Sequence, residues 1–459
     1  MGTSLLVQPE LRWSVDYRTD YIAPPLGLAY LAAVLLQNGR QTAILDLPMA
    51  RLGHEDVLAR IRKDQPDWVG LTCTTMNFPR TEALARDIKQ RFPDLPIVVG
   101  GPHVTYTAAT LLRDPQSPFD VVVRGEAEDV IADLDLALTG ADWRERAARV
   151  PGVCLRIDGQ VSLSPRTSLI ADLNSLPRPA RHLLPMERYR RYQPHTPVIT
   201  SRGCPFTCHF CSAGQMQGSK FRFRSPDNIL DEVEEIVDTY GFEVIHFSDD
   251  TFSYHRSRVL EICDRFLQRG ITARWLCETR AETLTEAMLR RMKEAGCFLV
   301  TMGVESGCQK LNERMGRRSH IGHIRQVVDW CHRVGIESRT GFMIGLAGET
   351  RDTLDRCLEF ALEIRPDHIA YSIMTPYPGT RIAEDPGAFD IEIVGRDFSE
   401  YRHDKANIRL PGLEPVDLER EWMRLVAETY VRKEEETVFV PTPKPMCQDC
   451  RHDAICFPG

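Results

Sequence analysis

The chain has no long uninterrupted hydrophobic run. No segment of its 459 residues approaches the roughly 20 consecutive apolar residues of a transmembrane helix. Charged residues, including Arg12, Asp16 and Arg18, interrupt the first twenty positions, where a secretory signal peptide would need an apolar core. We therefore expect a cytoplasmic protein with no membrane partner.

The sequence also lacks an excess of basic residues. Lysine and arginine number 57 against 65 acidic residues, for a formal net charge of −8, whereas a nucleic-acid footprint requires a basic face. We expect no nucleic-acid partner. A hydrophobic content of 42% and a charged content of 27% are typical of a soluble globular protein, and the length predicts two or three domains.

Cysteine, by contrast, is plentiful, and three of the 14 cysteines lie close together. Cys204, Cys208 and Cys211 have the spacing C-x3-C-x2-C, and three soft thiolates in one short loop suit an iron–sulfur cluster. A [4Fe–4S] cube usually takes four thiolates, so three leave one iron open to a small molecule. A zinc knuckle would normally add a fourth Cys or His, and His209 is poorly placed for that role. Zinc binding and core packing stay open as alternatives.

Residues 1–135 alternate short apolar runs with helical patterns, which predicts an α/β domain with a doubly wound parallel sheet. Ligands of such sheets bind in the loops beyond the carboxyl ends of the strands. These loops are rich in small residues and contain Thr75, Gly101 and Gly125, which we take as candidate cofactor-binding residues. The predicted strands are 4–7, 41–45, 68–72, 97–99 and 120–123.

A linker is predicted at 136–190, and strand–helix alternation resumes in residues 191–380. Six consecutive βα units predict a partial barrel with its active site at the carboxyl ends of the strands, and the cysteine loop follows the first of them. Residues 381–459 are predicted to form a helical region (415–435) with a terminal cysteine cluster. The six predicted strands are 198–201, 244–247, 274–278, 298–303, 337–344 and 368–373.

Short polar or glycine-containing stretches follow the later strands: H-F-S-D-D-T-F at 246–252, G-V-E-S-G at 303–307, F-M-I-G-L-A-G-E-T at 342–350 and P-Y-P-G-T at 376–380. Each stretch alone is a weak signal, but their order, each at a predicted strand end, is hard to obtain by chance. With the cysteine loop, they resemble radical S-adenosylmethionine (SAM) enzymes of the subfamily that carries an N-terminal cobalamin-binding domain. The resemblance covers roughly residues 1–380.

This resemblance implies that Cys204, Cys208 and Cys211 hold a [4Fe–4S] cluster whose open iron chelates SAM. Reductive cleavage would give methionine and a 5′-deoxyadenosyl radical, with an electron donor such as flavodoxin or ferredoxin. A carboxylate after the second strand would hold the SAM ammonium group. The candidate SAM-contact residues are Phe210, Ser248, Asp249, Asp250, Arg280, Glu305, Ser306 and Gly345. Ala347 replaces a proline often found in the glycine-rich stretch, which puts the rigidity of that loop in doubt.

Two stretches in the N-terminal half, P-P-L-G-L-A-Y-L at 24–31 and V-V-G-G-P-H at 98–103, also resemble the cobalamin-domain members. The Asp-x-His-x-x-Gly loop of cobalt-ligating domains is absent, although many members of this subfamily bind cobalamin without a histidine ligand. Two interpretations therefore stay open: a cobalamin site, and a domain kept as a scaffold or substrate wall.

The resemblance implies hydrogen abstraction from an unactivated carbon of a small-molecule natural product. We favour cobalamin-dependent C-methylation. Radical dehydration or rearrangement, as in the radical dehydratase of aminoglycoside biosynthesis, is the alternative, and a non-catalytic sensor is a remote one. The terminal cysteines Cys447, Cys450 and Cys456 are open to three interpretations: an auxiliary iron–sulfur cluster, a zinc knuckle, or reduced thiols.

Overall fold

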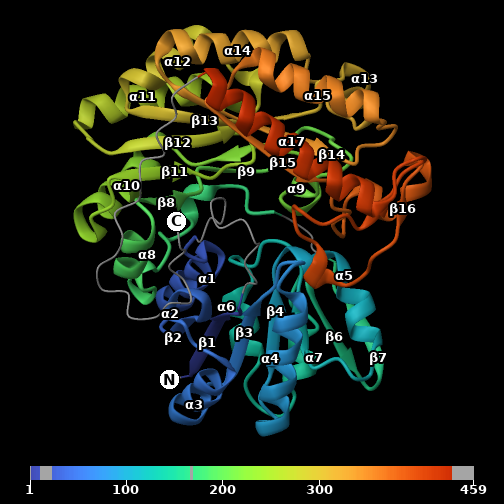
Figure 1. Ribbon diagram of the computed structural model, residues 1–459. Helices are drawn as coiled ribbons and strands as arrows, with labels where there is room; N and C mark the ends of the chain where they lie inside the picture. The colour runs from blue at the N-terminus through green and yellow to red at the C-terminus, as the bar shows by residue number, and fades with distance from the viewer. Residues whose placement is uncertain (1, 11–22, 166–168, 437–459) are drawn as a thin grey trace, which may run out of the picture.

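The computed structural model describes residues 2–10, 23–165 and 169–436, and the side chains up to residue 430. It consists of two α/β units, with the N-terminal unit below the second in the view of Figure 1. The predicted α/β fold class is confirmed. The terminal cysteines Cys447, Cys450 and Cys456 lie outside the described residues.

The N-terminal unit is built on a seven-stranded sheet of order β2-β1-β3-β4-β5-β6-β7, of which the first five strands are parallel. Helices cover both faces, and two separate hydrophobic clusters result. Leu6, Trp68 and Val98 belong to one, and Leu5, Val69 and Val99 to the other. The elements are β1 (Thr3–Gln8), α1 (Leu26–Gln37), β2 (Gln41–Asp46), α2 (Leu47–Ala50), α3 (His54–Asp64), β3 (Trp68–Thr72), α4 (Phe78–Arg91), β4 (Ile97–Gly100), α5 (Pro102–Arg113), β5 (Val121–Val123), α6 (Ile131–Ala137) and α7 (Trp143–Ala147).

The start of the predicted linker belongs to this sheet. β6 (Val153–Ile157) and β7 (Gln160–Leu163) form an antiparallel hairpin that extends the sheet beyond β5. Its turn is Asp158-Gly159, with positive φ at both residues (48° and 79°), the conformation that two-residue hairpins prefer. Two strands of this sheet thus come from the segment 136–190, which the sequence analysis describes as a linker.

The second unit contains a six-stranded parallel sheet of order β15-β14-β13-β12-β11-β8, in which chain neighbours are also spatial neighbours. β8 and β15 form its two edges, so the sheet is an open, partial barrel, as predicted. The strands are β8 (His195–Val198), β11 (Val244–Phe247), β12 (Arg274–Thr279), β13 (Cys297–Glu305), β14 (Glu337–Ile344) and β15 (His368–Ile373), and the covering helices are α8 (Met186–Tyr192), α10 (Pro226–Tyr240), α11 (Arg256–Arg269), α12 (Glu286–Glu294), α13 (Gln309–Arg314), α14 (Ile321–Val334) and α15 (Arg351–Ile364).

The first strand of this sheet is the one whose position was predicted wrongly. It ends at Val198, whereas the sequence predicted 198–201. The reason is the carboxylate of Asp249, which accepts hydrogen bonds from the amides of Thr200 (2.7 Å) and Ser201 (3.1 Å) and so removes them from the ladder. Residues Ser201–Arg202 instead form β9, which pairs with β10 (Arg222–Phe223).

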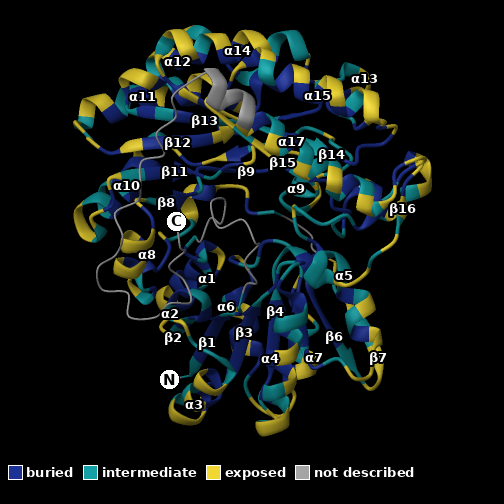
Figure 2. Cartoon of the chain, in the orientation of Figure 1, coloured by how far each residue is buried: buried dark blue, intermediate teal, exposed yellow. Residues whose placement is uncertain are grey.

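Helices cover only the outer face of the second sheet, and their exposed sides form the upper surface in Figure 2. The predicted C-terminal helix is present as α17 (Pro415–Glu436), which packs on β15 and α15. The remaining α-helices and strands are α9 (Ala213–Met216), α16 (Arg381–Glu384), β16 (Glu392–Ile393) and β17 (Ile408–Arg409).

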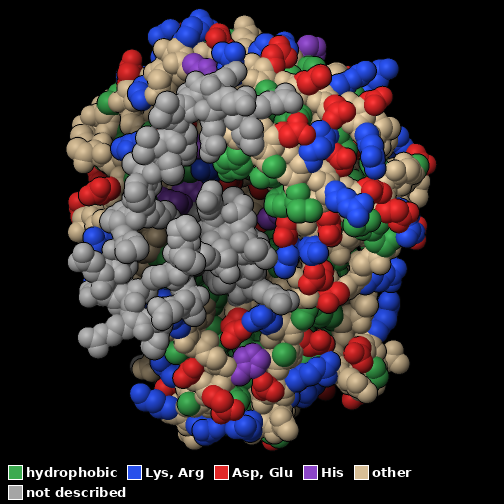
Figure 3. Space-filling view, in the orientation of Figure 1, with side chains coloured by type: hydrophobic (Ala, Val, Ile, Leu, Met, Phe, Trp, Pro, Cys, Tyr) green, Lys and Arg blue, Asp and Glu red, His purple; other side chains and the backbone are tan. Residues whose placement is uncertain are grey.

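The surface carries charges of both signs. On the face in Figure 3, basic and acidic side chains are interspersed rather than gathered into single-sign patches. Within the described residues, no helix combines the length and apolar character needed to cross a bilayer.

Candidate active site between the two units

The three-cysteine loop leaves β9 and crosses the carboxyl edge of the second sheet. The amide of Gly203 donates to Oε1 of Gln217 (3.1 Å), and the amide of Cys204 donates to the carbonyl of Gly218 (3.1 Å). At the far end of the loop, the amide of His209 donates to the carbonyl of Met315 (2.9 Å). Hydrogen bonds to two other segments of the chain therefore hold the backbone at both ends of the cysteine loop.

The surroundings of the thiols suit thiolate ligands. The guanidinium of Arg280 donates to Sγ of Cys208 (3.3 Å) and stacks over the ring of Phe206, 3.9 Å from its centroid. The amide of Ala213 donates to Sγ of Cys211 (3.4 Å). Although Cys211 is exposed, the protein atoms crowded around its sulfur raise the pKa of the thiol to about 11, so the thiolate needs compensating positive charge. Iron would supply that charge, and the three sulfur donors on one loop fit a cluster.

His209 contributes no zinc ligand to this loop in the conformation described. Its Nδ1 lies 3.2 Å from the carbonyl of Arg314, and its Nε2 lies 3.4 Å from Arg381. Between residues 2 and 430, outside the two gaps, no three His, Cys, Asp or Glu side chains converge on a point where one metal ion could sit. A cubane does not need such convergence, because each thiolate binds a different iron.

The two neighbouring aspartates after β11 have different surroundings. Asp249 is buried, and its carboxylate is occupied by the amides and hydroxyls of Thr200 and Ser201. Asp250 is exposed. Although water reaches it, the protein atoms crowded around its carboxyl group, with the charges of Asp249 and Glu278, raise its pKa to about 6. Of the two, only Asp250 has a carboxylate that can meet a ligand.

The stretch at the end of β13 contains a bulge. Glu305 has a positive φ of 64°, and the pairing register between β13 and β14 shifts there. Its carboxylate pairs with Arg317 (3.0 Å) and is nearly buried, and burial raises its pKa. Ser306 is fully buried, and its Oγ accepts from the amide of Cys308 (3.1 Å). Because the side chains of Glu305 and Ser306 are engaged within the protein, a ligand at this turn would contact the backbone of the turn.

The glycine-rich stretch after β14 is held by a buried carboxylate. Glu349 accepts from the amides of Gly345 and Leu346 (3.1 Å for Leu346). Burial raises the pKa of Glu349 to about 8, although the two amides oppose the shift. Phe210 packs nearby, half-buried against a hydrophobic cluster of this unit, and the amide of Ser248 donates to the carbonyl of Val198 (3.0 Å). All the candidate SAM-contact residues thus lie in loops at one edge of the sheet or in the cysteine loop.

A second recess lies at the carboxyl edge of the N-terminal sheet. This cavity of about 240 Å³ is lined mainly by apolar side chains and by five glycines, among them the predicted Gly101 and Gly125. A Cβ atom at Gly101 would lie 2.5 Å from the carbonyl oxygen of Cys73, so a larger residue does not fit there. Thr75, also predicted, is not part of the lining and is buried against His103 (3.3 Å). The apolar, glycine-walled lining at the edge of a doubly wound sheet has the character of an organic-cofactor site, and its volume would hold part of a molecule the size of cobalamin.

Comparison with known proteins identifies the two units. Residues 198–361 match the radical SAM superfamily, and residues 16–135 match the B12 binding domain. An uncharacterized methyltransferase of Pyrococcus horikoshii is 33% identical over 381 residues, which cover 83% of this chain and 82% of the relative. The chain is a radical SAM enzyme with a B12-binding domain.

Other relatives place it within that family. The anaerobic magnesium-protoporphyrin IX monomethyl ester cyclase of Rubrivivax gelatinosus is 28% identical over 406 residues, or 86% of this chain and 71% of the cyclase. The fold is that of the radical SAM methyltransferase TsrM from Kitasatospora setae, whose structure holds cobalamin and a [4Fe–4S] cluster. The TM-score is 0.73 at 19% identity, with 93% of this chain and 91% of TsrM covered.

Family membership confirms three predictions made from the sequence. The chain is an enzyme, its cofactors are a [4Fe–4S] cluster, SAM and cobalamin, and the methyltransferases among its relatives agree with the predicted C-methylation. The roles of individual side chains stay predictions.

The residues that join this radical SAM enzyme's two units were not found from the sequence. Glu126 and Glu128 follow β5, and they pair with arginines of the second unit. Arg222 makes two hydrogen bonds to Glu126 (2.7 and 3.0 Å), and Arg202 makes one to Glu128 (2.5 Å). Burial alone would raise the pKa of Glu126, but the hydrogen bonds from Arg222 and the charge of Arg202 outweigh it and lower that pKa. Gly125-Glu126-Ala127-Glu128 looked like a ligand loop, and no local pattern showed its distant partners.

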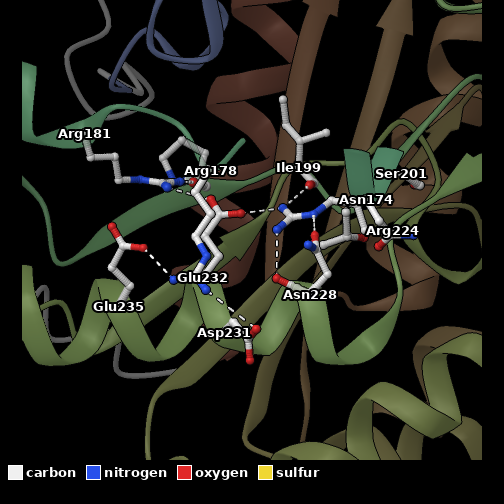
Figure 4. A network of polar contacts seen from close by, with 12 residues as sticks. Asn174, Arg178, Arg181, Ile199, Ser201, Arg224, Asn228, Asp231, Glu232 and Glu235 are labelled. Atoms are coloured by element: carbon white, nitrogen blue, oxygen red, sulfur yellow. Dashed lines mark hydrogen bonds and ion pairs between the residues drawn. The ribbon is translucent and has the colours of Figure 1, made fainter. Parts of the chain in front are cut away.

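A second buried network supports the residues just before the cysteine loop (Figure 4). Arg224 donates to the carbonyl of Ile199 (3.0 Å) and pairs with Glu232 of α10, which also pairs with Arg181 (2.6 Å). Arg224, Glu232 and Arg181 are almost wholly buried. Because removing one partner leaves a buried charge uncompensated, such a network fixes the local backbone strongly.

Proposed function

We propose that this chain is a cobalamin-dependent radical SAM methyltransferase that methylates a carbon atom of a small natural product. The observation that carries the proposal is the meeting of two sites: Arg202, two residues before Cys204, is also part of the wall of the glycine-lined cavity. When bound, the cluster and SAM supply a carbon-centred radical, and cobalamin supplies a transferable methyl group.

In this proposal the loops of the second sheet hold SAM. The carboxylate of Asp250 accepts a charge-assisted hydrogen bond from the SAM ammonium group, because it is exposed at the strand end beside the cysteine loop. Arg280 stabilises the thiolate of Cys208 by a charge-assisted hydrogen bond. The backbone at Glu305, Ser306 and Gly345 and the ring of Phe210 line the rest of the SAM site.

The substrate is proposed to lie against the inner face of the partial barrel. That face carries polar side chains: Glu278 is 49% exposed, and its Oε1 lies 3.5 Å from Nε2 of His246. The His246 ring in turn lies 6.0 Å from that of His195. These groups favour a hydrogen-bonding substrate over a purely apolar one.

We further infer that the electron donor is a flavodoxin or ferredoxin and that the enzyme works in the cytoplasm. All eleven cysteines among the described residues are free thiols, which supports a reducing compartment.

The test uses protein reconstituted anaerobically with iron, sulfide and cobalamin, then supplied with a reductant and SAM that carries a labelled methyl group. We expect corrinoid absorption to survive gel filtration and the label to pass to the protein-bound corrinoid, with formation of S-adenosylhomocysteine. Formation of 5′-deoxyadenosine without any methyl transfer would instead support dehydration or ring formation, the latter being the type of reaction in the cyclase relative. Release of neither product would indicate a sensor.

A further inference from the structure

The cysteine loop is held at both of its ends by the N-terminal unit. At its start, Arg202 of β9 makes a buried ion pair with Glu128 (2.5 Å) and lies 3.5 Å from Glu126. At its end, the hydroxyl of Tyr106 on α5 donates to the carbonyl of Ser212 (3.0 Å), the residue after Cys211. Contacts from another unit thus fix the backbone on either side of the three thiols.

The residues at the start of the loop also form part of the cavity wall. Glu126, Glu128, Arg202 and Gln217 all line the cavity. Gln217 accepts the hydrogen bond from the amide of Gly203, next to the first cysteine. A molecule that fills the cavity therefore touches the same side chains that position Cys204.

We propose that Glu126 and Glu128 are positioning residues for the cysteine loop, and that ligand binding in the cavity they line is coupled to the presence of the cluster. The inference rests on the proposed function, in which the ligand is cobalamin. The glutamates act on the loop through their contacts with Arg202 and Arg222.

The physical reason for coupling is that the two sites share side chains. All four charged groups are more than nine-tenths buried, so each carboxylate depends on its guanidinium for compensation. A cluster that orders the loop keeps Arg202 in place as part of the cavity wall. If the cluster raises the affinity for a ligand in the cavity by some factor, linkage requires that the ligand raise the affinity for the cluster by the same factor.

The first measurement compares two preparations of the full chain, one with the cluster and one without iron. Hydroxocobalamin is titrated into each under anaerobic conditions, and the dissociation constant is taken from the visible spectrum of the bound corrinoid. We expect the cluster-loaded protein to bind at least about fivefold more tightly, the lower end of typical coupling between two sites.

The variant Glu128→Gln removes the charge that holds Arg202, and we expect the ratio of the two dissociation constants to fall toward one. Tyr189→Phe is the matched control. It removes a buried hydrogen bond between the units, from Tyr189 of α8 to Asp46, but neither residue lines the cavity, so the wild-type ratio should remain. If Glu128→Gln does not fold, Gln217→Leu replaces it, because Gln217 lines the cavity and accepts from the amide of Gly203; its ratio should also fall below that of the wild type.

The reverse measurement follows iron loss from the cluster to a chelator. Hydroxocobalamin should slow that loss in the wild type and in Tyr189→Phe, but not in Glu128→Gln. Equal dissociation constants with and without the cluster in the wild type would overturn the inference alone, as would an unchanged ratio in a folded Glu128→Gln protein. If hydroxocobalamin binds neither preparation, the proposed function and this inference are both wrong.

Discussion

The two large sheets of this enzyme are both built mainly from parallel strands joined by helices, but they bury these strands differently. β3, β4 and β5 are buried along nearly their whole length. Along β14, by contrast, Ser338, Thr340, Phe342 and Ile344 are buried while Arg339 between them is exposed. A sheet covered on both faces offers a ligand only its edge, whereas a sheet covered on one face offers its whole inner surface. The recess at the edge of the first sheet and the open inner face of the second follow from this difference.

The largest expected effect is the loss of SAM cleavage in the second unit while the N-terminal unit stays folded. Cys208→Ala should abolish SAM cleavage, because it removes a cluster ligand, and should leave the N-terminal sheet folded. Reduced protein is assayed for 5′-deoxyadenosine, and folding is followed by circular dichroism. Cys154→Ala, in the N-terminal sheet, serves as the control and should keep the cluster absorption. Residual 5′-deoxyadenosine formation by Cys208→Ala would refute the cluster assignment.

The next comparison is between a strand buried on both faces and one buried on a single face. Leu71→Ala in β3 should lower the free energy of unfolding by about 2–5 kcal/mol, because Leu71 is 2% exposed and its removal leaves a cavity. Arg339→Ala on the inner face of β14 should change it by less than about 0.5 kcal/mol. Denaturant titration measures both, and similar losses in the two variants would contradict the one-sided burial of the second sheet.

A smaller effect concerns the two aspartates after β11. Asp250→Asn should weaken SAM binding by about 1.5–3 kcal/mol, the usual range for a hydrogen bond to a charged group. Asp249→Asn should instead lower stability, since Asp249 holds the amides of Thr200 and Ser201. Anaerobic calorimetry gives SAM affinity and thermal unfolding gives stability. Undiminished affinity in the Asp250 variant would remove this carboxylate from the SAM site.

The smallest expected effect compares two buried glutamates. Glu126 has arginine partners and a lowered pKa, whereas Glu349 accepts from two backbone amides and has a pKa raised to about 8. Between its ordinary pKa and 8, the folded state keeps a proton on Glu349 that the unfolded state has lost. Raising the pH through this window therefore costs about 1.4 kcal/mol of stability per pH unit. Denaturant unfolding at pH 6.5 and at pH 7.5 measures this loss of stability. Glu349→Gln should not show it, because glutamine carries no titrating proton. Equal losses in the wild type and the variant would show that Glu349 is ionised in the folded state.

Much of the fold follows from local patterns. The predicted strands 244–247 and 337–344 coincide with β11 and β14, because β-branched and apolar residues are bounded there by clear helical segments. β8 was misplaced because a side chain far along the chain, Asp249, takes the amides of Thr200 and Ser201. Cys277, within the predicted strand 274–278, is packed in the core beneath the helices.

The sequence by itself determined the chemistry, because three cysteines in one loop and glycine-containing turns after successive strands form a local pattern. Only the tertiary structure decided which of Asp249 and Asp250 is exposed to a ligand, and that Glu126 and Glu128 hold Arg202 and Arg222. Those pairs join residues more than seventy positions apart. From the sequence alone, these four charged residues could equally lie in exposed turns. Only the packing of the two units shows that they are buried together.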